Sequence, residues 1–537
     1  FKQKTAYEIM PSLVGSEMCI RDRLRILNAK NFVAGVASTA NSYYSFVGLP
    51  NPTDYDTDWN TSPPGPIDNF NQEDNYWDTM IGLKKISKTD VRQVVRKTTW
   101  TSGTTYDMYR NNVSPSSVSK PSNAVTLYDA NYYVINSDYR VYECLSNGTS
   151  PDYPSGRPSL DEPTFTDLEP REAGTSGDGY IWKYLYTISP SDIVKFDSTN
   201  YLPVPQDWET NTTDATVRKN AASSGQLKVV TISNRGVGVG TANKTYTKVP
   251  IQGDGSGAEA TITVNNDSKV DTITISNGGS GYTFGTVDLA GGNVPSGSTD
   301  PIFDVVIPPQ GGHGSDIYRE LGAYNVLLYS RIENDTDNPD FITGNQIARI
   351  GVVESPQGYD SDSILTSDKA SAAYALKLAG TGYSAVTFDA DAHVTQTIGI
   401  GSTAFGRVIN YDSNTGVLKL WQDKFHCGFN TDGTRNTSPT YGFKMQRFTA
   451  DIGSGGNFNI IGGSATLGIQ TTFGSAANPG VSTVINSKTY NLGQSFIKGV
   501  AQPEVKKYSG EIIYVDNRPA ITRSTNQKED IKVILQF

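Results

Sequence analysis

The alternating residues Asp389, Asp391 and His393 are the clearest candidates for metal-ligand chemistry in the sequence. Side chains two positions apart on a β-strand point to the same face, so these three could face one ion. The alternative is a solvated polar face of a surface strand, which needs no ligand. We prefer the alternative, because the spacing is the sole argument for an ion. The sequence thus assigns no metal site and leaves these three residues as the named candidate.

Histidine and cysteine offer little else for acid–base or nucleophilic chemistry. His426 precedes Cys427, but neighbours on a strand point to opposite faces and would not form the hydrogen bond that activates a thiol. His313 lies in a GGHG segment, which predicts a flexible corner leading back to the core. The wide spacing of Cys19, Cys144 and Cys427 predicts reduced, buried thiols, not a disulfide framework or a zinc site.

Other motifs that resemble ion or phosphate sites lack a required part. Asp54, Asp56 and Asp58 mimic the start of a calcium loop, but Trp59 and Gly65 stand where that loop needs Gly and Glu. The glycines of GDGSG are followed by the alternating AEATITV, which predicts a strand, whereas a phosphate loop needs a helix N-terminus. A glycan hydrolase would need two carboxylates in a cleft, and no motif indicates such a pair. We therefore assign no catalytic residue and no cofactor.

Charge and hydropathy limit the partners. The 537 residues include 45 basic and 55 acidic side chains, a net charge of −10, and the basic residues are scattered. Nucleic-acid binding needs a clustered positive face, so we expect no nucleic-acid partner. No run of 18 apolar residues occurs, so we expect no membrane insertion.

The composition predicts a mainly β fold. The chain has 52 Gly, 27 Pro and 30 Tyr, and 19% of its residues are charged, which favours short strands joined by turns over long helices. We expect a layered β-sandwich core with few short helices and two inserted small β modules. One helix is predicted at Asn75–Leu83, where apolar residues fall at helical spacing.

Several strands can be placed by alternation and turn signals. Tyr180–Ile188 should put four aromatic residues on one face, after a turn at Gly177–Gly179. Val229–Asn234 and Thr272–Asn277 predict strands, each followed by a glycine-rich turn. Two further expectations are a hairpin of strands 407–411 and 417–421, and a final strand with Ile531, Val533, Leu535 and Phe537 on one face.

The amino-acid composition changes several times along the chain, and these changes predict six regions. Residues 1–23 resemble translated sequencing-adapter read-through, so we expect them to lie outside the native protein and to make few native contacts. The remaining regions are a core part at 24–226, a glycine-rich β module at 227–312, a core part at 313–356, a second β-rich insert at 357–505 and C-terminal core strands at 506–537.

Four segments have a distinctive order and character. They are YYSFVGLPNP at 43–52 with YWDTMIG at 76–82, RQVVRKTTW at 92–100, GDGYIWKYLYTISP at 177–190 and SGEIIYVDNRPAI at 509–521. Together they resemble the baseplate wedge protein of T-even-type phages, the gene product eight family, in its enlarged form from marine T-even-like phages. The matching parts cover about half of the chain, and the two inserts lie beyond them. The positions that carry over are structural: Gly177, Asp178, Gly179, Trp182, Gly510, Tyr514, Asn517, Arg518 and Pro519.

The resemblance implies a structural protein of the virion, located in the tail baseplate and assembled in the host cytoplasm, without enzymatic activity. Its implied partners are a second copy of itself, as a homodimer, and other wedge and peripheral baseplate proteins. A tail-associated adhesin that binds host-surface glycans through the inserts is the alternative. Exposed Trp or Tyr side chains in 227–310 or 357–505 would favour the adhesin.

The final strand generates a prediction about assembly. A strand that runs to the last residue frays unless a sheet holds it, so we expect this strand to be part of a sheet. Deleting the residues from Ile531 onward should then expose the apolar sheet surface that it covers. We expect the truncated protein to lose the soluble dimer that size-exclusion chromatography would detect for the full chain. A folded dimer after truncation would show that this strand is not part of the core.

Overall fold

The computed structural model describes residues 14–53, 58–68, 70–221, 225–333, 346–379, 383–422, 446–523 and 527–537, with backbone only for 14–20 and 70–72. His426, Cys427, Asp54 and Asp56 lie outside these residues, as does the side chain of Cys19. The chain divides into two compact units. The first combines residues 1–33, 92–328 and 533–537, and the second combines residues 34–91 and 329–532.

The fold is mainly β, as predicted, and its sheets are antiparallel. The helices are α1 (Val14–Ala37), α2 (Phe70–Thr79), α3 (Pro190–Phe196), α4 (Ala215–Asn220) and α5 (Ile317–Leu321), with short 3₁₀ turns at Lys88–Asp90, Leu127–Asp129 and Tyr383–Ala385. Most are short, whereas α1 has 24 residues. Helix α1 includes residues 14–23, but the side chains of 14–20 are not described, so the expectation of few native contacts for 1–23 stays a prediction.

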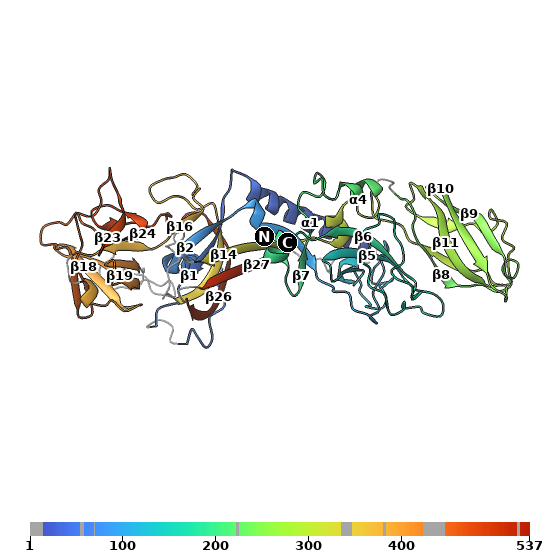
Figure 1. Ribbon diagram of the computed structural model, residues 1–537, viewed down its shortest axis with the longest axis horizontal. Coiled ribbons are helices and arrows are strands. Elements are labelled where there is room, and N and C mark those ends of the chain that lie inside the picture. Colours follow the sequence, from blue (N-terminus) through green and yellow to red (C-terminus); the bar gives the residue numbers. More distant parts are fainter. Residues whose placement is uncertain are drawn as a thin grey trace. The chain divides into compact units, whose positions relative to one another are not determined.

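The first unit has an aromatic core around a three-stranded sheet (Figure 1). Its strands, in order across the sheet, are β4 (Tyr133–Ile135), β5 (Arg140–Asn147) and β6 (Tyr180–Thr187). Strand β6 confirms the predicted aromatic strand, and the buried Trp182 stacks on Tyr180 with ring centroids 5.3 Å apart. The predicted alternation is wrong in detail. Register shifts between β5 and β6 and packing on both faces bury Lys183 and Leu185 as well, and leave Tyr184 half-buried.

The turn before β6 explains its glycines. Gly177 and Gly179 have φ of +67° and +84°, a region that glycine adopts without strain. The buried Asp178 accepts hydrogen bonds from the backbone N–H groups of Tyr180, at 3.0 Å, and Leu160, at 2.8 Å. The glycines therefore let the backbone turn, and the carboxylate of Asp178 fixes the start of β6.

A second sheet of the first unit has four strands. They are β7 (Tyr201–Pro203) and β3 (Val91–Arg96), together with parts of β14 (Asn325–Glu333) and β27 (Lys528–Gln536). Only the residues of β14 and β27 that belong to the first unit are meant. The final strand is thus paired in a sheet, as predicted. Ile531 and Val533 of β27 are buried, while Leu535 and Phe537 are half-buried.

Residues 230–305 form two small sheets of the first unit with a hydrophobic core of their own (Figure 1). The four-stranded sheet has the order β11 (Val270–Ser280), β10 (Ser256–Val264), β9 (Thr245–Gly253) and β12 (Gly285–Val287). The second sheet pairs β8 (Val230–Asn234) with β13 (Ile302–Val305). The strands predicted at Val229–Asn234 and Thr272–Asn277 are confirmed.

The second unit contains a five-stranded sheet, a seven-stranded sheet and a hairpin. The five strands are, in order, β16 (Lys369–Ser371), β2 (Met80–Ile86), β1 (Tyr43–Gly48), β15 (Gln346–Glu354) and β26 (Glu511–Thr522). The seven are β22 (Ala465–Gly468), β21 (Asn459–Gly462), β18 (His393–Gly399), β19 (Ser402–Asp412), β20 (Val417–Trp421), β17 (Tyr374–Lys377) and β25 (Val500–Ala501). Strands β23 (Gly480–Ile485) and β24 (Lys488–Phe496) form the hairpin. The β19–β20 pair confirms the hairpin predicted there.

The predicted helix at Asn75–Leu83 is wrong in its second half. Helix α2 ends at Thr79, and Met80 begins β2. In the sheet, Leu83 lies opposite Phe46 of β1, and Met80, Ile81 and Leu83 are buried. Pairing with β1 therefore overrides the helical spacing of these apolar residues, which a buried strand also accommodates.

The outer strand β26 is irregular along its length. Its register with β15 shifts at two places, near Ile513 and between Asn517 and Ile521. Residues 59–64 cover part of it: Trp59 donates from Nε1 to the carbonyl of Arg518 at 2.8 Å, and the Asn60 side chain accepts from the N–H of Ala520 at 3.0 Å. Bulges and this loop therefore occupy much of the edge that β26 presents.

A buried arginine joins three distant segments of the second unit. Arg349 of β15 is 1% exposed, and its guanidinium donates to the side chains of Thr79, Asn51, at 3.1 Å, and Asn517, at 2.9 Å. The ring of Tyr76 has its centroid 4.9 Å from the guanidinium carbon. Loss of water lowers the pKa of Arg349 to about 10, so the group stays charged at neutral pH.

We expect Arg349→Met to lower the free energy of unfolding by about 2–4 kcal/mol, because each buried acceptor left without a donor costs about 1–3 kcal/mol. Urea denaturation would measure the loss. The matched control is Arg331→Met, since Arg331 forms a half-exposed ion pair with Asp530 at 2.7 Å. The control should cost less than about 1 kcal/mol. Equal effects of the two substitutions would contradict a central role for Arg349.

Candidate functional site

The three residues that the sequence named as candidate ligands do not lie on one strand face. Strand β18 begins only at His393, and Asp391 lies in the preceding turn with φ of +65°. One carboxylate oxygen of Asp391 accepts from the backbone N–H of Thr53 at 3.2 Å, and the other lies 3.3 Å from the guanidinium of Arg407. Within the described part of the chain, Asp389, Asp391 and His393 do not form a group of closely spaced ligand atoms.

A different set of chemical groups converges inside the first unit: Glu143, His313 and Glu320. Glu143 comes from β5, Glu320 from α5, and His313 from the turn that precedes α5. One ligand-type atom from each residue lies within 4.8 Å of the other two. All three side chains are buried, and Glu143 is fully inaccessible. This Glu–His–Glu cluster is the candidate site.

The turn that carries His313 is fixed by glycines and by Trp208. Gly311, Gly312 and Gly314 have φ between +86° and +92°. A Cβ on Gly312 would lie 2.3 Å from the carbonyl oxygen of Ala221. The indole N–H of Trp208 donates to the carbonyls of Gly314, at 3.2 Å, and Ser315, at 3.0 Å. The GGHG segment is a corner that leads back to the core, as predicted, and these contacts hold it and bury its histidine. Its expected flexibility stays a prediction.

The histidine stands between the two carboxylates. Its Nδ1 lies 2.8 Å from Oε2 of Glu143 and 3.0 Å from Oε1 of Glu320. The other oxygen of Glu320 accepts from the backbone N–H of Gly314 at 2.7 Å. The ring of Tyr109 meets the imidazole edge-on, with centroids 4.9 Å apart. Two carboxylates in one buried site repel each other unless a cation or a proton is shared between them.

Burial and mutual charge set the protonation of the cluster. Burial, followed by the charge of Glu320, raises the pKa of Glu143 to about 8. Burial alone would lower the pKa of His313, but the charge and hydrogen bond of Glu143 outweigh it and raise the value to about 9. Protons can therefore balance the two carboxylates at neutral pH, with the imidazole as a cation between them.

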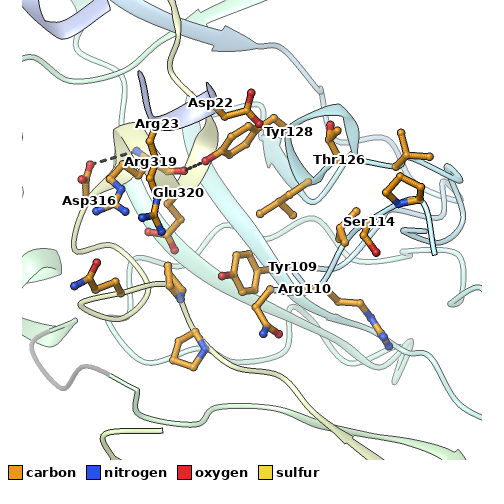
Figure 2. Close-up of a pocket in the computed structure, with 18 residues that line it drawn as sticks. Asp22, Arg23, Tyr109, Arg110, Ser114, Thr126, Tyr128, Asp316, Arg319 and Glu320 are labelled. Carbon is orange, nitrogen blue, oxygen red and sulfur yellow. Dashed lines mark hydrogen bonds between the residues drawn. The ribbon is translucent and has the colours of Figure 1, made fainter. Parts of the chain in front are cut away.

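A pocket of about 290 Å³ reaches one side of the cluster (Figure 2). Glu320 and Tyr109 contribute to its wall, together with charged residues from α1 and α5. Asp316 accepts from the backbone N–H of Arg319 at 3.2 Å, and Tyr128 donates to the carbonyl of Arg319 at 2.7 Å, so both are engaged in holding α5. Glu320 therefore lies between the cluster and the pocket, with its side chain only 1% exposed.

A second, much smaller cavity lies on the His313 side. Its volume is about 10 Å³, near the smallest space that holds a water molecule, and Lys183 and Asn220 also line it. Lys183 of β6 lies opposite Glu143 in the sheet. Its ammonium donates to the carbonyl of Leu168 and to the side chain of Asn220, at 2.7 Å. Lys183 thus adds a buried positive charge next to the cluster.

The sequence analysis missed this site, although two signals were present. Glu143 stands in the otherwise apolar stretch VYECL, where a carboxylate on a buried strand needs a partner. His313 sits among glycines that allow close approach of the backbone. Cys144, the neighbour of Glu143, is a free buried cysteine, as predicted, and burial raises the pKa of its thiol.

A scan against protein-family models matches no family, and a search of curated proteins finds no matching sequence. Among the described residues, no helix combines the length and the apolar character that a bilayer span requires. The fold and the cluster therefore define a mainly β protein of two compact units, one of which has a charged cluster in its core.

The buried Lys183 generates a prediction about pH. Burial lowers the pKa of Lys183 from 10.5 to about 8. Between these values the unfolded chain binds a proton that the folded chain does not, so the stability contributed by Lys183 increases with pH. Relative to Lys183→Met, the wild type should gain up to about 1.4 kcal/mol of unfolding free energy per pH unit in this window.

The measurement is urea denaturation of both proteins between pH 7 and pH 10. Lys228→Met is the control, since Lys228 forms an ion pair with Glu169 at a more exposed position, 2.8 Å apart. Its difference from the wild type should change little with pH. A difference for Lys183→Met that is independent of pH would show that the amine titrates at its ordinary value.

Proposed function

We propose that the chain is a structural subunit of the baseplate wedge of a contractile phage tail. In this role it acts through a homodimer interface and through contacts with other wedge and peripheral baseplate proteins during assembly and contraction. It works as a scaffold in the virion and not as an enzyme. The proposal rests on the resemblance of four sequence segments to T-even-type wedge proteins, and the structure supplies one observation in its favour.

That observation is the meeting of two of the four resembling segments around Arg349. Asn51 lies near the end of YYSFVGLPNP and Thr79 lies in YWDTMIG, the two parts of the first segment, and Asn517 belongs to SGEIIYVDNRPAI. All three side chains accept hydrogen bonds from Arg349. The strands β1, β2 and β26 from these segments are part of one sheet. These two segments therefore share one structural task, as expected if their resemblance reflects a common framework.

The remaining signature residues also have structural roles. The turn Gly177–Gly179 fixes the start of β6, and the side chain of Trp182 is buried in the core next to it. Gly510 has φ of +78°, and a Cβ there would lie 2.4 Å from the carbonyl oxygen of Glu354. Arg518 pairs with Asp516 at 2.6 Å on β26. The contacts described for these residues hold turns and strands in place, which supports a scaffold role, although the Arg518 side chain is exposed.

The adhesin alternative receives no comparable support. In the described parts of 227–310 and 357–505, every Trp and Tyr side chain is buried or half-buried. Glycan-binding sites usually present the ring of a Trp or Tyr to the sugar, and among the described residues of these inserts no Trp or Tyr is exposed. The large exposed apolar residues of the inserts are aliphatic or phenylalanine, such as Ile400 and Phe284.

The oligomeric mass of the purified full chain tests the proposal. Light scattering should give a dimer for the chain alone and a larger, defined complex when neighbouring wedge proteins from the same phage are co-expressed. A self-complementary two-fold interface is the physical basis of the first expectation. A monomer or trimer that ignores the co-expressed proteins would contradict the wedge role, and glycan-array binding would then test the adhesin.

A further inference from the structure

The Glu–His–Glu cluster has the donor atoms of a metal site. Two carboxylate oxygens and one imidazole nitrogen lie within 4.8 Å of one another, and His313 Nδ1 is 2.8 Å and 3.0 Å from the two oxygens. Ligand atoms of one tetrahedral or octahedral ion are separated by about 3 Å when each bond is about 2.0–2.2 Å long. The spacing on the His313 side therefore already matches a coordination sphere.

The second oxygen of Glu143 points to a ligand. Glu143 is 0% exposed, and no donor among the described residues forms a hydrogen bond with its Oε1. A buried carboxylate oxygen without a partner costs free energy, and native structures avoid the cost with a donor, a water molecule or an ion. A metal ion between the three side chains would engage this carboxylate.

A metal ion could replace the protons that balance the cluster. With the imidazole neutral and both glutamates ionised, the two carboxylates bring a charge of −2 into the core. One divalent ion neutralises this charge completely, whereas the nearby ammonium of Lys183 is engaged with Leu168 and Asn220. Buried charges are stable in proteins when they are paired or coordinate a metal.

We propose that Glu143, His313 and Glu320 bind one divalent transition-metal ion, of which Zn²⁺ is the best match. An imidazole ligand favours a transition metal over Mg²⁺ or Ca²⁺, which prefer oxygen ligands alone. Water from the adjoining pocket at Glu320 and Tyr109 completes the coordination. The inference does not depend on the proposed baseplate role.

The ion would have a structural function. It would connect strand β5, the glycine corner and helix α5, three elements from residues 140–147, 311–314 and 317–321. The corner follows the module of residues 230–305, so the ion would fix the point where the chain returns from this module to the aromatic core. A buried site that links three elements stabilises the folded state, because the unfolded chain cannot assemble it.

Zinc retention by the purified full chain tests the inference. The protein is stripped with a chelator, incubated with ZnCl₂, separated by gel filtration and analysed by mass spectrometry of the elements. We expect one zinc per chain above the level of the controls and a higher melting temperature with zinc. Glu143→Gln and Glu320→Gln should each bind zinc more than about 100-fold more weakly, since loss of an outer-shell partner alone costs about 10–100-fold.

Glu169→Gln is the matched control, because Glu169 is a nearby carboxylate that pairs with Lys228 outside the cluster. It should retain zinc like the wild type. The visible spectrum of bound Co²⁺ in the wild type gives a readout that does not depend on the folding of any variant. The inference is wrong if the wild type retains no zinc, if both Gln variants retain it equally, or if only Mg²⁺ or Ca²⁺ raises the melting temperature.

Discussion

Arg349 carries a positive charge into a place that water does not reach, and the sheet around it is arranged to meet that charge. Three side-chain oxygens and two aromatic rings surround the guanidinium. These groups come from residues 51–79 and 517, whereas the charge belongs to residue 349. The charge is therefore satisfied only when distant parts of the second unit have come together. A constraint of this kind specifies one arrangement of the strands, because an alternative register would leave the charge unpaired.

The core of the first unit also contains buried charges that need partners, but here the charges of the carboxylates are negative. Its core contains two carboxylates beside an imidazole and a lysine, inside a layer of tyrosines. Hydrophobic packing supplies most of the stability of such a core but is weakly directional. The charged groups add directional contacts between β5, α5 and the glycine corner. For a protein proposed to work in a contractile assembly, such contacts favour transmission of force through units that keep their shape.

Local patterns in the sequence predicted local structure well. The hairpin β19–β20 and the strands β8, β11 and β6 were placed by alternation and turn residues, although the burial of β6 departs from strict alternation. The helix expected at Asn75–Leu83 failed because Met80–Leu83 pair with β1, a contact that spacing within one segment does not reveal. The Glu–His–Glu cluster was missed for the same reason, since Glu143 and His313 are 170 positions apart. The spacing of Asp391 suggested a metal ligand on a strand, but Asp391 lies in the turn that precedes β18.

The irregular strand β26 has a consequence for the association of this chain with other chains. A long, regular outer strand offers unpaired backbone groups to any other chain and thereby promotes aggregation. The two register shifts of β26 and its cover from Trp59 and Asn60 interrupt that template. Copies of the chain are therefore less prone to pair edge to edge through this strand.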